Sequence, residues 1–276
     1  ADVAWARSEA EGSVPFGEHN FDRFNARVQL AGATSQTDLF AGYQAKFFGW
    51  PNLYTPFNSN ETENLQTLLV AWNHRTDFGR GDFLEAGAWY RRNKDDYAFN
   101  RFAPLGPVHP FQHTTWAHGA AFGGRKSPGD VTIHFRGEWV ADELKSTSLT
   151  VGRFHTRTLT KFSLVPEKAW GPAAGERVVV KAGAGYDDSN RGGAAVSPVF
   201  ELAREQPGAA LQRIHFSYAK TTQVPTYTAL NSSAVAGLFR GNANLGRESS
   251  HNVELGARGT LLGWTGQAAL FHRRDD

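Results

Sequence analysis

The stretch D-V-T-I-H-F-R-G-E-W-V-A-D, residues 130–142, decides the fold class of this chain. Apolar residues, among them Val131, Phe135 and Trp139, alternate with polar ones such as Arg136 at a repeat of two. Because successive side chains of a β-strand point to opposite faces, this repeat predicts a strand with one apolar and one charged face. The fold then depends on whether the apolar face contacts a protein core or lipid.

The composition excludes several classes of protein. Of the 276 residues 40% are hydrophobic, and 29 lysines and arginines nearly balance 27 acidic residues. With a formal charge of only +2, the sequence predicts no nucleic-acid partner, because binding phosphates requires a basic surface. The longest apolar run, residues 68–72, is far shorter than the roughly 20 residues of a membrane-spanning helix. Any contact with a bilayer is therefore predicted to be made by strands.

The same alternation recurs along the whole chain. It predicts an all-β protein with about thirteen antiparallel strands in a meander. The expected strands cover residues 1–7, 24–30, 38–47, 62–74, 84–91, 113–123, 130–142, 147–163, 176–187, 196–204, 213–218, 250–259 and 264–273.

The connections between these strands alternate between short and long. The short set covers residues 32–36, 75–81, 124–129, 166–176, 205–210 and 260–263. The other set covers residues 10–20, 49–61, 93–112, 142–146, 187–195 and 222–249, of which only 142–146 is brief. Outer-membrane barrels have short turns at one end and longer loops at the other, so we predict an up-and-down transmembrane β-barrel. A soluble β-sandwich is the alternative, although its Greek-key connections mix lengths at both ends.

The cost of placing charge in lipid predicts which face points outward. Turning Arg136 toward the bilayer midplane would cost about 2–4 kcal/mol, so the apolar face is expected outside. The predicted lipid-facing belt contains Trp116, Phe135, Trp139, Phe216 and Tyr218. The predicted lumen-facing residues are Arg27, Glu85, Arg91, His134, Arg136 and Glu138.

Catalytic and metal-binding patterns are not evident in the sequence. The chain has no cysteine, which excludes disulfides and thiolate chemistry. His109 and His113 are four residues apart, but Pro110 and its neighbours indicate an irregular loop rather than a helix that presents metal ligands. No G-x-S-x-G or Walker motif occurs. We therefore predict that the protein is not an enzyme and that it has no metal site and no cofactor.

The C-terminal region carries a resemblance to a known family. It reads T-Q-V-P-T-Y-T-A-L from Thr222, then G-N-A-N-L-G-R-E-S-S-H-N-V-E-L-G-A-R-G, and finally A-A-L-F-H-R-R-D-D. This resembles the end of TonB-dependent receptors, where an R-A-P-like tripeptide precedes G-N-P-x-L-x-P-E-x-S-x-N-x-E-L-G and an A-x-L-F-Y-type strand. The matching residues are Pro225, Gly241, Asn242, Leu245, Glu248, Ser250, Asn252, Glu254, Leu255, Gly256, Leu270 and Phe271. The chain departs from the pattern at Gln223, Ala243 and Arg247, and residues 41–67 and 184–202 are also similar to this family.

The resemblance implies active transport across the outer membrane of a Gram-negative bacterium. Receptors of this family take up a scarce nutrient complex, such as a ferric siderophore or cobalamin, with energy delivered by the partner TonB. They combine an N-terminal plug with a barrel of roughly 22 strands. Residues 1–276 are therefore expected to be a partial barrel domain, without the plug through which TonB acts and without the C-terminal strands. A passive porin-like channel and a soluble β-sandwich binding module are the alternatives.

Ligand contacts are expected from the long loops, because aromatic and arginine side chains suit chelate or ring-shaped ligands. Packing within the loops or anchoring at lipid headgroups is the alternative role for each of these side chains. The predicted contact residues are Trp50, Asn52 and Tyr54 in one loop, Tyr97, Phe99 and Arg101 in a second, and Tyr227, Phe239 and Arg240 in a third.

Overall fold

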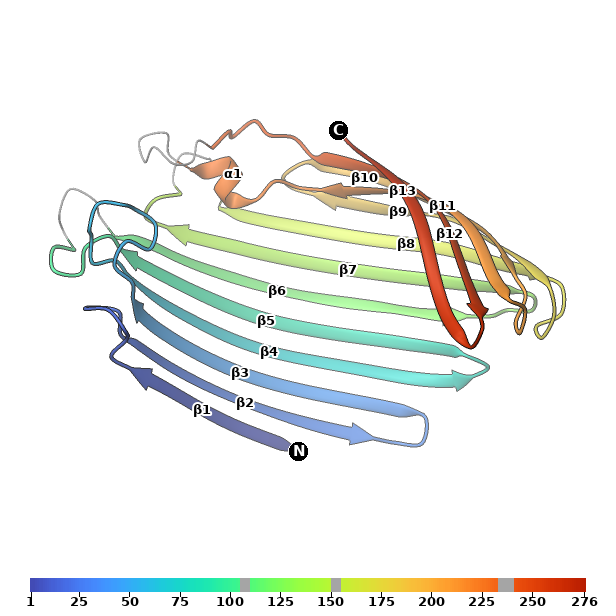
Figure 1. Cartoon of the computed structure of the whole chain (residues 1–276), viewed down its shortest axis with the longest axis horizontal. Helices are drawn as coiled ribbons and strands as arrows, with labels where there is room; N and C mark the ends of the chain where they lie inside the picture. Colours follow the sequence, from blue (N-terminus) through green and yellow to red (C-terminus); the bar gives the residue numbers. More distant parts are fainter. Residues whose placement is uncertain (105–109, 150–154, 233–240) are drawn as a thin grey trace.

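A computed structural model describes residues 1–104, 110–149, 155–232 and 241–276, and the predicted contact residues Phe239 and Arg240 lie outside these ranges. Within the described residues, thirteen strands form one antiparallel sheet in which each strand pairs with its neighbours in the sequence (Figure 1). The strands are β1 (Asp2–Ala10), β2 (His19–Ala31), β3 (Ser35–Gly49), β4 (Thr62–Gly79), β5 (Asp82–Ala98), β6 (Phe111–Lys126), β7 (Val131–Ser146), β8 (Thr156–Trp170), β9 (Arg177–Ser189), β10 (Gly193–Glu205), β11 (Leu211–Gln223), β12 (Glu248–Leu261) and β13 (Trp264–Asp275).

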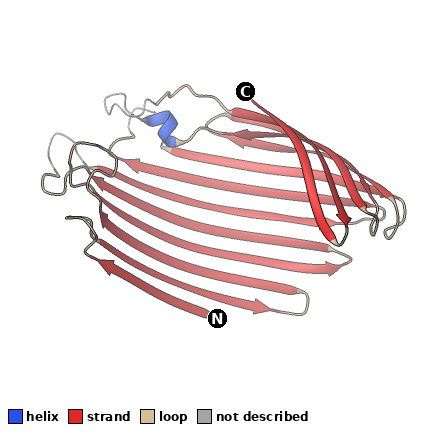
Figure 2. Ribbon diagram, viewed as in Figure 1, coloured by secondary structure: helices blue, strands red, loops and turns tan. Residues whose placement is uncertain are grey.

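The predicted all-β, up-and-down architecture is confirmed. A short helix, α1 (Tyr227–Asn231), interrupts the connection between β11 and β12 and is the blue element in Figure 2. In the part of the chain that the structure describes, no helix is long and apolar enough to cross a membrane. The sheet is curved and open, with β1 and β13 as its two edges (Figure 2). It therefore forms part of a barrel wall and not two packed layers, which excludes the β-sandwich alternative.

The strand register gives the sheet two unlike faces. Trp139 lies opposite Ala120 on β6 and Thr160 on β8, so these residues share a face. Following the register across the sheet assigns nearly all large exposed apolar side chains of the strands to this face. They include Phe24, Val28, Leu39, Tyr43, Val70, Trp72, Leu84, Tyr90, Phe122, Trp139, Phe162, Leu164, Val178, Tyr186, Val196, Leu202, Ile214, Phe216 and Leu255.

The opposite face is the sheltered one. Ala117, Leu144, Val179 and Ala203 are buried there, although they belong to a single layer of strands. All six residues that the sequence assigns to a lumen lie on this face: Arg27, Glu85, Arg91, His134, Arg136 and Glu138. That this face lines a lumen stays a prediction.

One end of the sheet carries tight turns. They cover residues 32–34, 80–81, 127–130, 171–176, 206–210 and 262–263. The turn between β4 and β5 needs unusual backbone angles, since Gly79 (φ 78), Arg80 (φ 55) and Gly81 (φ 78) all have positive φ. Glycine adopts such angles without steric cost, which explains the G-R-G sequence. We call this end the tight-turn end.

The other end, the long-connection end, differs from the prediction in three places. Strand β5 runs to Ala98, so Tyr97, predicted in the loop 93–112, lies in a strand. Strand β7 continues to Ser146, so residues 142–146 are not a connection, and the following strand begins at Thr156 and not at residue 147. Between β9 and β10 only residues 190–192 remain outside the strands, because Asp187 and Ser189 pair with Ala195 and Gly193. The polar and glycine-rich composition of residues 187–195 suggested a long loop, but the register extends both strands through it.

Candidate ligand-binding site at the long-connection end

Exposed rings gather on three neighbouring connections. The aromatic loop cluster consists of the described residues of connections 11–18, 50–61 and 99–104. Phe57 is 72% exposed and Phe102 is 62% exposed, and Trp50 is also exposed. Phe16 lies edge-on to Phe102 at 5.0 Å between ring centroids, so the first and third connections touch. Exposed apolar surface of this kind is typical of binding sites.

Glu61 holds the second connection in place. Its side chain is 0% exposed and accepts hydrogen bonds from the Tyr54 backbone N–H (2.9 Å), the Thr55 backbone N–H (3.2 Å) and the Thr55 hydroxyl (2.6 Å). A buried carboxylate is stable only when such donors surround it. The sequence analysis did not identify Glu61, since it ends a predicted loop, where an acidic residue normally meets solvent.

Tyr54 is therefore presented on a fixed backbone. Its hydroxyl donates to Glu63 Oε2 at 3.1 Å, and its ring lies 5.3 Å from the ring of Tyr97. Burial, followed by the charge of Glu63, raises the pKa of Tyr54 to about 12. Tyr97 is itself buried and stacks on Phe111 at 5.7 Å. The structure thus brings these two predicted contact residues together, with Tyr54 exposed and Tyr97 behind it.

The other predicted residues of these two loops have structural partners. Asn52, with a φ of 59°, accepts a hydrogen bond from the Ser59 backbone N–H at 3.1 Å and so closes its own turn. Arg101 forms an ion pair with Glu18, which ties the third connection to the first. Phe99 lies 6.5 Å from the Phe57 ring. Several of the named side chains therefore hold these connections together, and their contact with a ligand stays a prediction.

Charged residues dominate the other part of this end. The ionic anchor cluster consists of Asp142 on β7, Arg157 on β8, Asp187 on β9, Tyr227 on α1 and Arg247 before β12. Asp142 Oδ2 accepts hydrogen bonds from Arg157 Nη2 (2.7 Å) and Nε (3.1 Å), and Asp142 Oδ1 accepts one from the Tyr227 hydroxyl (2.6 Å). Tyr227 therefore lies on β7 and β8, away from the aromatic loop cluster.

A second anchor fixes the far end of the connection between β11 and β12. Arg247 forms an ion pair with Asp187, and each of these side chains is only 10% exposed. The Thr222 hydroxyl donates to Asp187 Oδ2 at 2.8 Å and accepts from Arg247 Nη1 at 3.0 Å. Arg247 also donates to the carbonyl of Gly193. The sequence analysis noted Arg247 only as a departure from a family pattern.

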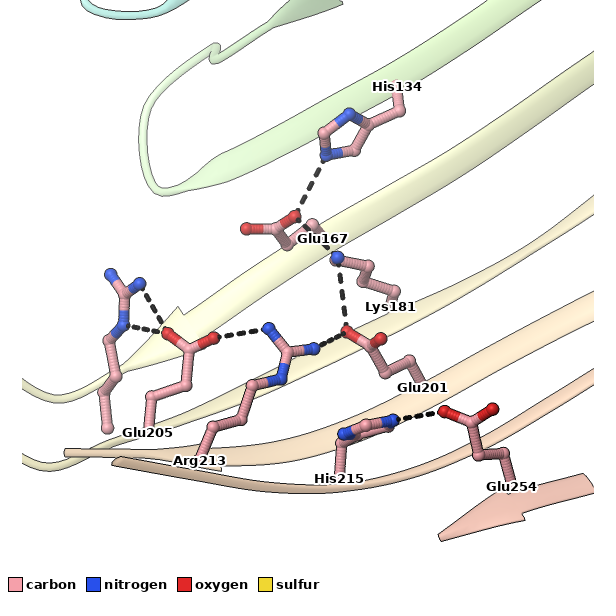
Figure 3. A network of polar contacts seen from close by, with 9 residues as sticks. His134, Glu167, Lys181, Glu201, Glu205, Arg213, His215 and Glu254 are labelled. Atoms are coloured by element: carbon pink, nitrogen blue, oxygen red, sulfur yellow. Dashed lines mark hydrogen bonds and ion pairs between the residues drawn. The ribbon is translucent and has the colours of Figure 1, made fainter. Parts of the chain in front are cut away.

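The sheltered face carries a chain of ion pairs nearer the tight-turn end. This charged ribbon consists of His134, Glu167, Lys181, Glu201, Arg213, Glu205 and Arg177, and Figure 3 shows it running across β7 to β11. Basic and acidic groups alternate, with separations such as 3.0 Å from His134 to Glu167 and 2.9 Å from Arg213 to Glu201. On β11 and β12, His215 and Glu254 form a further pair at 2.9 Å (Figure 3). Each charge is thus compensated by a neighbour.

Metal binding receives no support from the side-chain arrangement. No group of three or more histidine, aspartate or glutamate side chains within reach of one ion occurs in residues 1–104, 110–149, 155–232 and 241–276. The predicted loop histidine His109 lies outside these ranges, and His113 instead contacts the Ser146 hydroxyl at 2.9 Å.

Together, a single up-and-down antiparallel sheet, an exposed apolar face and a polar sheltered face define the wall of a membrane β-barrel. The family model described as "TonB dependent receptor-like, beta-barrel" matches residues 8–276, so the chain belongs to this family. The expected resemblance is confirmed over nearly the whole chain. The family model describes a receptor, and a solved structure of similar fold is a siderophore receptor, which agrees with the prediction of a non-enzyme.

Solved structures with the same fold include several receptors. The siderophore receptor PirA from Pseudomonas aeruginosa has a TM-score of 0.66 and 16% identity, over 93% of this chain and 46% of that chain. A variant of the ferric enterobactin receptor PfeA from Pseudomonas aeruginosa, in complex with enterobactin, has a TM-score of 0.66 and 17% identity, over 95% and 44%. The alcaligin outer membrane receptor FauA from Bordetella pertussis has a TM-score of 0.59 and 13% identity, over 99% and 46%.

The chain spans less than half the length of each of these three structures. At such low identity the likeness concerns the fold alone. A search of curated proteins gave no match.

Proposed function

We propose that this chain is part of the barrel of an outer-membrane receptor of a Gram-negative bacterium, which takes up a scarce nutrient complex with energy from TonB. A ferric siderophore is the favoured nutrient complex, and cobalamin or another metal chelate is the alternative. TonB would act through a plug domain, and outer-membrane lipid would surround the wall. Membership of the receptor family supports the proposal, as do the siderophore receptors among the similar structures.

The observation that carries this proposal is the contrast between the two faces of the sheet. Apolar side chains such as Trp139 and Phe162 are exposed on one face, and each Å² that they place in hydrocarbon instead of water contributes about 25 cal/mol. The charged ribbon lies on the other face, where hydrocarbon would be unfavourable by several kcal/mol for each unpaired charge. A sheet with these faces suits lipid outside and polar contents inside.

The ligand would be captured at the long-connection end. Trp50, Tyr54 and Phe57 offer exposed rings on a connection that Glu61 fixes, so binding a metal chelate would cost little loop ordering. The Arg101 guanidinium lies 5.8 Å from the centre of the Phe102 ring in the same cluster, and Glu18 compensates its charge. The lumen-facing residues predicted from the sequence would meet the polar contents of the barrel.

Uptake by the full-length receptor tests the proposal directly. The receptor is expressed in a host that lacks its own siderophore receptors, and uptake of labelled ferric siderophores is measured with and without TonB. We expect saturable uptake that depends on TonB. Equal uptake in both strains would instead indicate a passive channel.

Two aromatic variants connect this test with the proposed site. Phe57→Ala is expected to weaken uptake at low ligand concentration, because it removes an exposed ring from the long-connection end. Phe78→Ala is the matched control, since Phe78 is 60% exposed at the tight-turn end. Equal losses in the two variants would contradict the placement of the site.

A further inference from the structure

The Tyr227 hydroxyl occupies a site built entirely by other segments of the chain. Among the described residues, three oxygen atoms lie within hydrogen-bonding distance of it: Asp142 Oδ1 at 2.6 Å, the Asp142 carbonyl at 3.3 Å and the His155 carbonyl at 3.2 Å. The Arg157 guanidinium carbon lies 5.3 Å from the centre of the Tyr227 ring. None of these groups belongs to α1, so the phenol ring is a guest on the ends of β7 and β8.

The chemistry of this site selects a particular kind of guest. All three oxygen atoms are acceptors, so the guest must donate a hydrogen bond. A guanidinium at this distance from a ring favours an aromatic guest. Burial, followed by the hydrogen bond to Asp142, raises the pKa of Tyr227 well above its ordinary value, so the phenol keeps its proton. A phenol with a free hydroxyl satisfies each of these conditions.

The site does not need Tyr227 to keep its shape. Arg157 holds Asp142 through Oδ2, whereas Tyr227 uses Oδ1. The Asp142 side chain is only 9% exposed, and its charge remains paired with Arg157 when the phenol leaves. The acceptors and the guanidinium therefore remain in position for another guest.

The connection that carries Tyr227 is held independently at its other end. Arg247 pairs with Asp187 on β9, which is not part of the Tyr227 site. Between the two anchors lies α1, a helix of only 5 residues whose start depends on a 3.2 Å hydrogen bond from the Ala229 N–H to the Thr226 hydroxyl. Such a short helix is marginal by itself. Departure of α1 from β7 and β8 would expose Leu230 and Asn231, which are buried, while the pair of Arg247 and Asp187 keeps the connection attached.

We propose that Tyr227 is a tethered self-ligand, and that Asp142, His155 and Arg157 form a site for the ring and free hydroxyl of a phenolic ligand when α1 moves away. The inference rests on the proposed function in one respect, namely that ligands arrive at the long-connection end. A group on a short tether acts as though present at about millimolar concentration. A free phenol must exceed that concentration or gain additional contacts, so the tether sets a threshold that favours larger phenolic ligands.

Binding of p-cresol, the side chain of tyrosine as a free molecule, tests this site. The full-length protein in detergent is titrated calorimetrically, as the wild type and as Tyr227→Ala. We expect p-cresol to bind Tyr227→Ala at least tenfold more tightly than the wild type. Toluene, which has the ring without the hydroxyl, is expected to bind the variant at least tenfold more weakly than p-cresol.

A second variant leaves Tyr227 in place and guards against misfolding of the first. Thr226→Ala removes the hydroxyl that starts α1, so the self-ligand competes less well and p-cresol is expected to bind more tightly than to the wild type. Equal affinity of p-cresol for the wild type and both variants would overturn the proposal, as would equal binding of toluene and p-cresol to Tyr227→Ala. Because no uptake is measured, failure of this test is distinct from failure of the siderophore test.

Discussion

The aromatic loop cluster and the ionic anchor cluster lie at the same end of the sheet, yet they use their side chains in opposite ways. Phe57 and Phe102 expose most of their surface, whereas Asp187 and Arg247 expose only a tenth of theirs. In the aromatic loop cluster Glu61 fixes the second connection and leaves the Phe57 ring exposed. In the ionic anchor cluster the charged side chains themselves attach the connection between β11 and β12 to the strands. The difference teaches that an aromatic or charged side chain is available to a ligand only where another residue holds its backbone in place.

The largest effect is expected when the buried ion pair is broken. Asp187→Ala leaves the Arg247 charge buried without its carboxylate, and Arg247→Ala does the reverse. Each is expected to lower the free energy of unfolding by about 3–5 kcal/mol, and the double variant by less than the sum. Urea unfolding in detergent measures this. Arg204→Ala is the control, because its pair with Glu176 is half exposed and worth about 0–1 kcal/mol.

A smaller and local effect is expected in the aromatic cluster when its buried carboxylate is removed. Glu61→Ala leaves the part-buried amides of Tyr54 and Thr55 without their acceptor. Because water can reach part-buried donors, the expected total cost is about 1–3 kcal/mol. Hydrogen exchange of these two amides should accelerate while that of the strands stays unchanged. Glu63→Gln serves as the control, since the Glu63 side chain contacts the Tyr54 hydroxyl and Asp95 and neither of the two amides. Unchanged exchange in Glu61→Ala would mean that the connection is held by something else.

High pH should loosen the aromatic cluster before the ionic one. The pKa of Tyr54 is raised from 10.0 to about 12, so folding favours its protonated form. The resulting stabilisation is fully present below pH 10 and is lost as the pH rises toward 12. Ultraviolet difference absorbance of the phenolate reports this titration, and Tyr54→Phe should remove it. A Tyr54 that titrates at its ordinary value would argue against the contact with Glu63.

The smallest effect on stability is expected from the exposed rings. Phe57→Ala should change the free energy of unfolding by less than about 0.5 kcal/mol, since this side chain is mostly in solvent. The same variant should weaken binding of the siderophore taken up by the receptor by about 0.5–1.5 kcal/mol, the contribution of one aromatic contact. Isothermal titration measures the second value. A large loss of stability would show that Phe57 is part of the packing and not of a free surface.

Local alternation was sufficient to predict the sheet but not the contacts between its connections. A repeat of two identifies strands and faces, because each side chain's face depends only on its position in the strand. The pairing of Asp187 with Arg247 joins residues 60 positions apart, which no local pattern encodes. One signal was present: a charged residue, Arg247, stands where the family motif has proline. Such a replacement is stable only with a new partner, and the structure supplies it.

The errors in the connections have the same origin. Residues 187–195 have the composition of a loop, yet Asp187 extends its strand because Ala195 is there to pair with it. Composition indicates which backbone conformations a segment can adopt, whereas strand pairing depends on the sequence of the neighbouring strand. For the same reason Glu61 was assigned to a solvent-exposed loop, although the folded connection encloses it.

The charged ribbon on the sheltered face has a consequence for electric fields. Its three carboxylates alternate with three lysine and arginine groups, so their potentials cancel within a short distance of the wall. A multiply charged solute moving past this belt would experience neither strong attraction nor strong repulsion. The electrostatic potential along the charged ribbon would be close to zero, and an ionic cargo would not become trapped there at low salt.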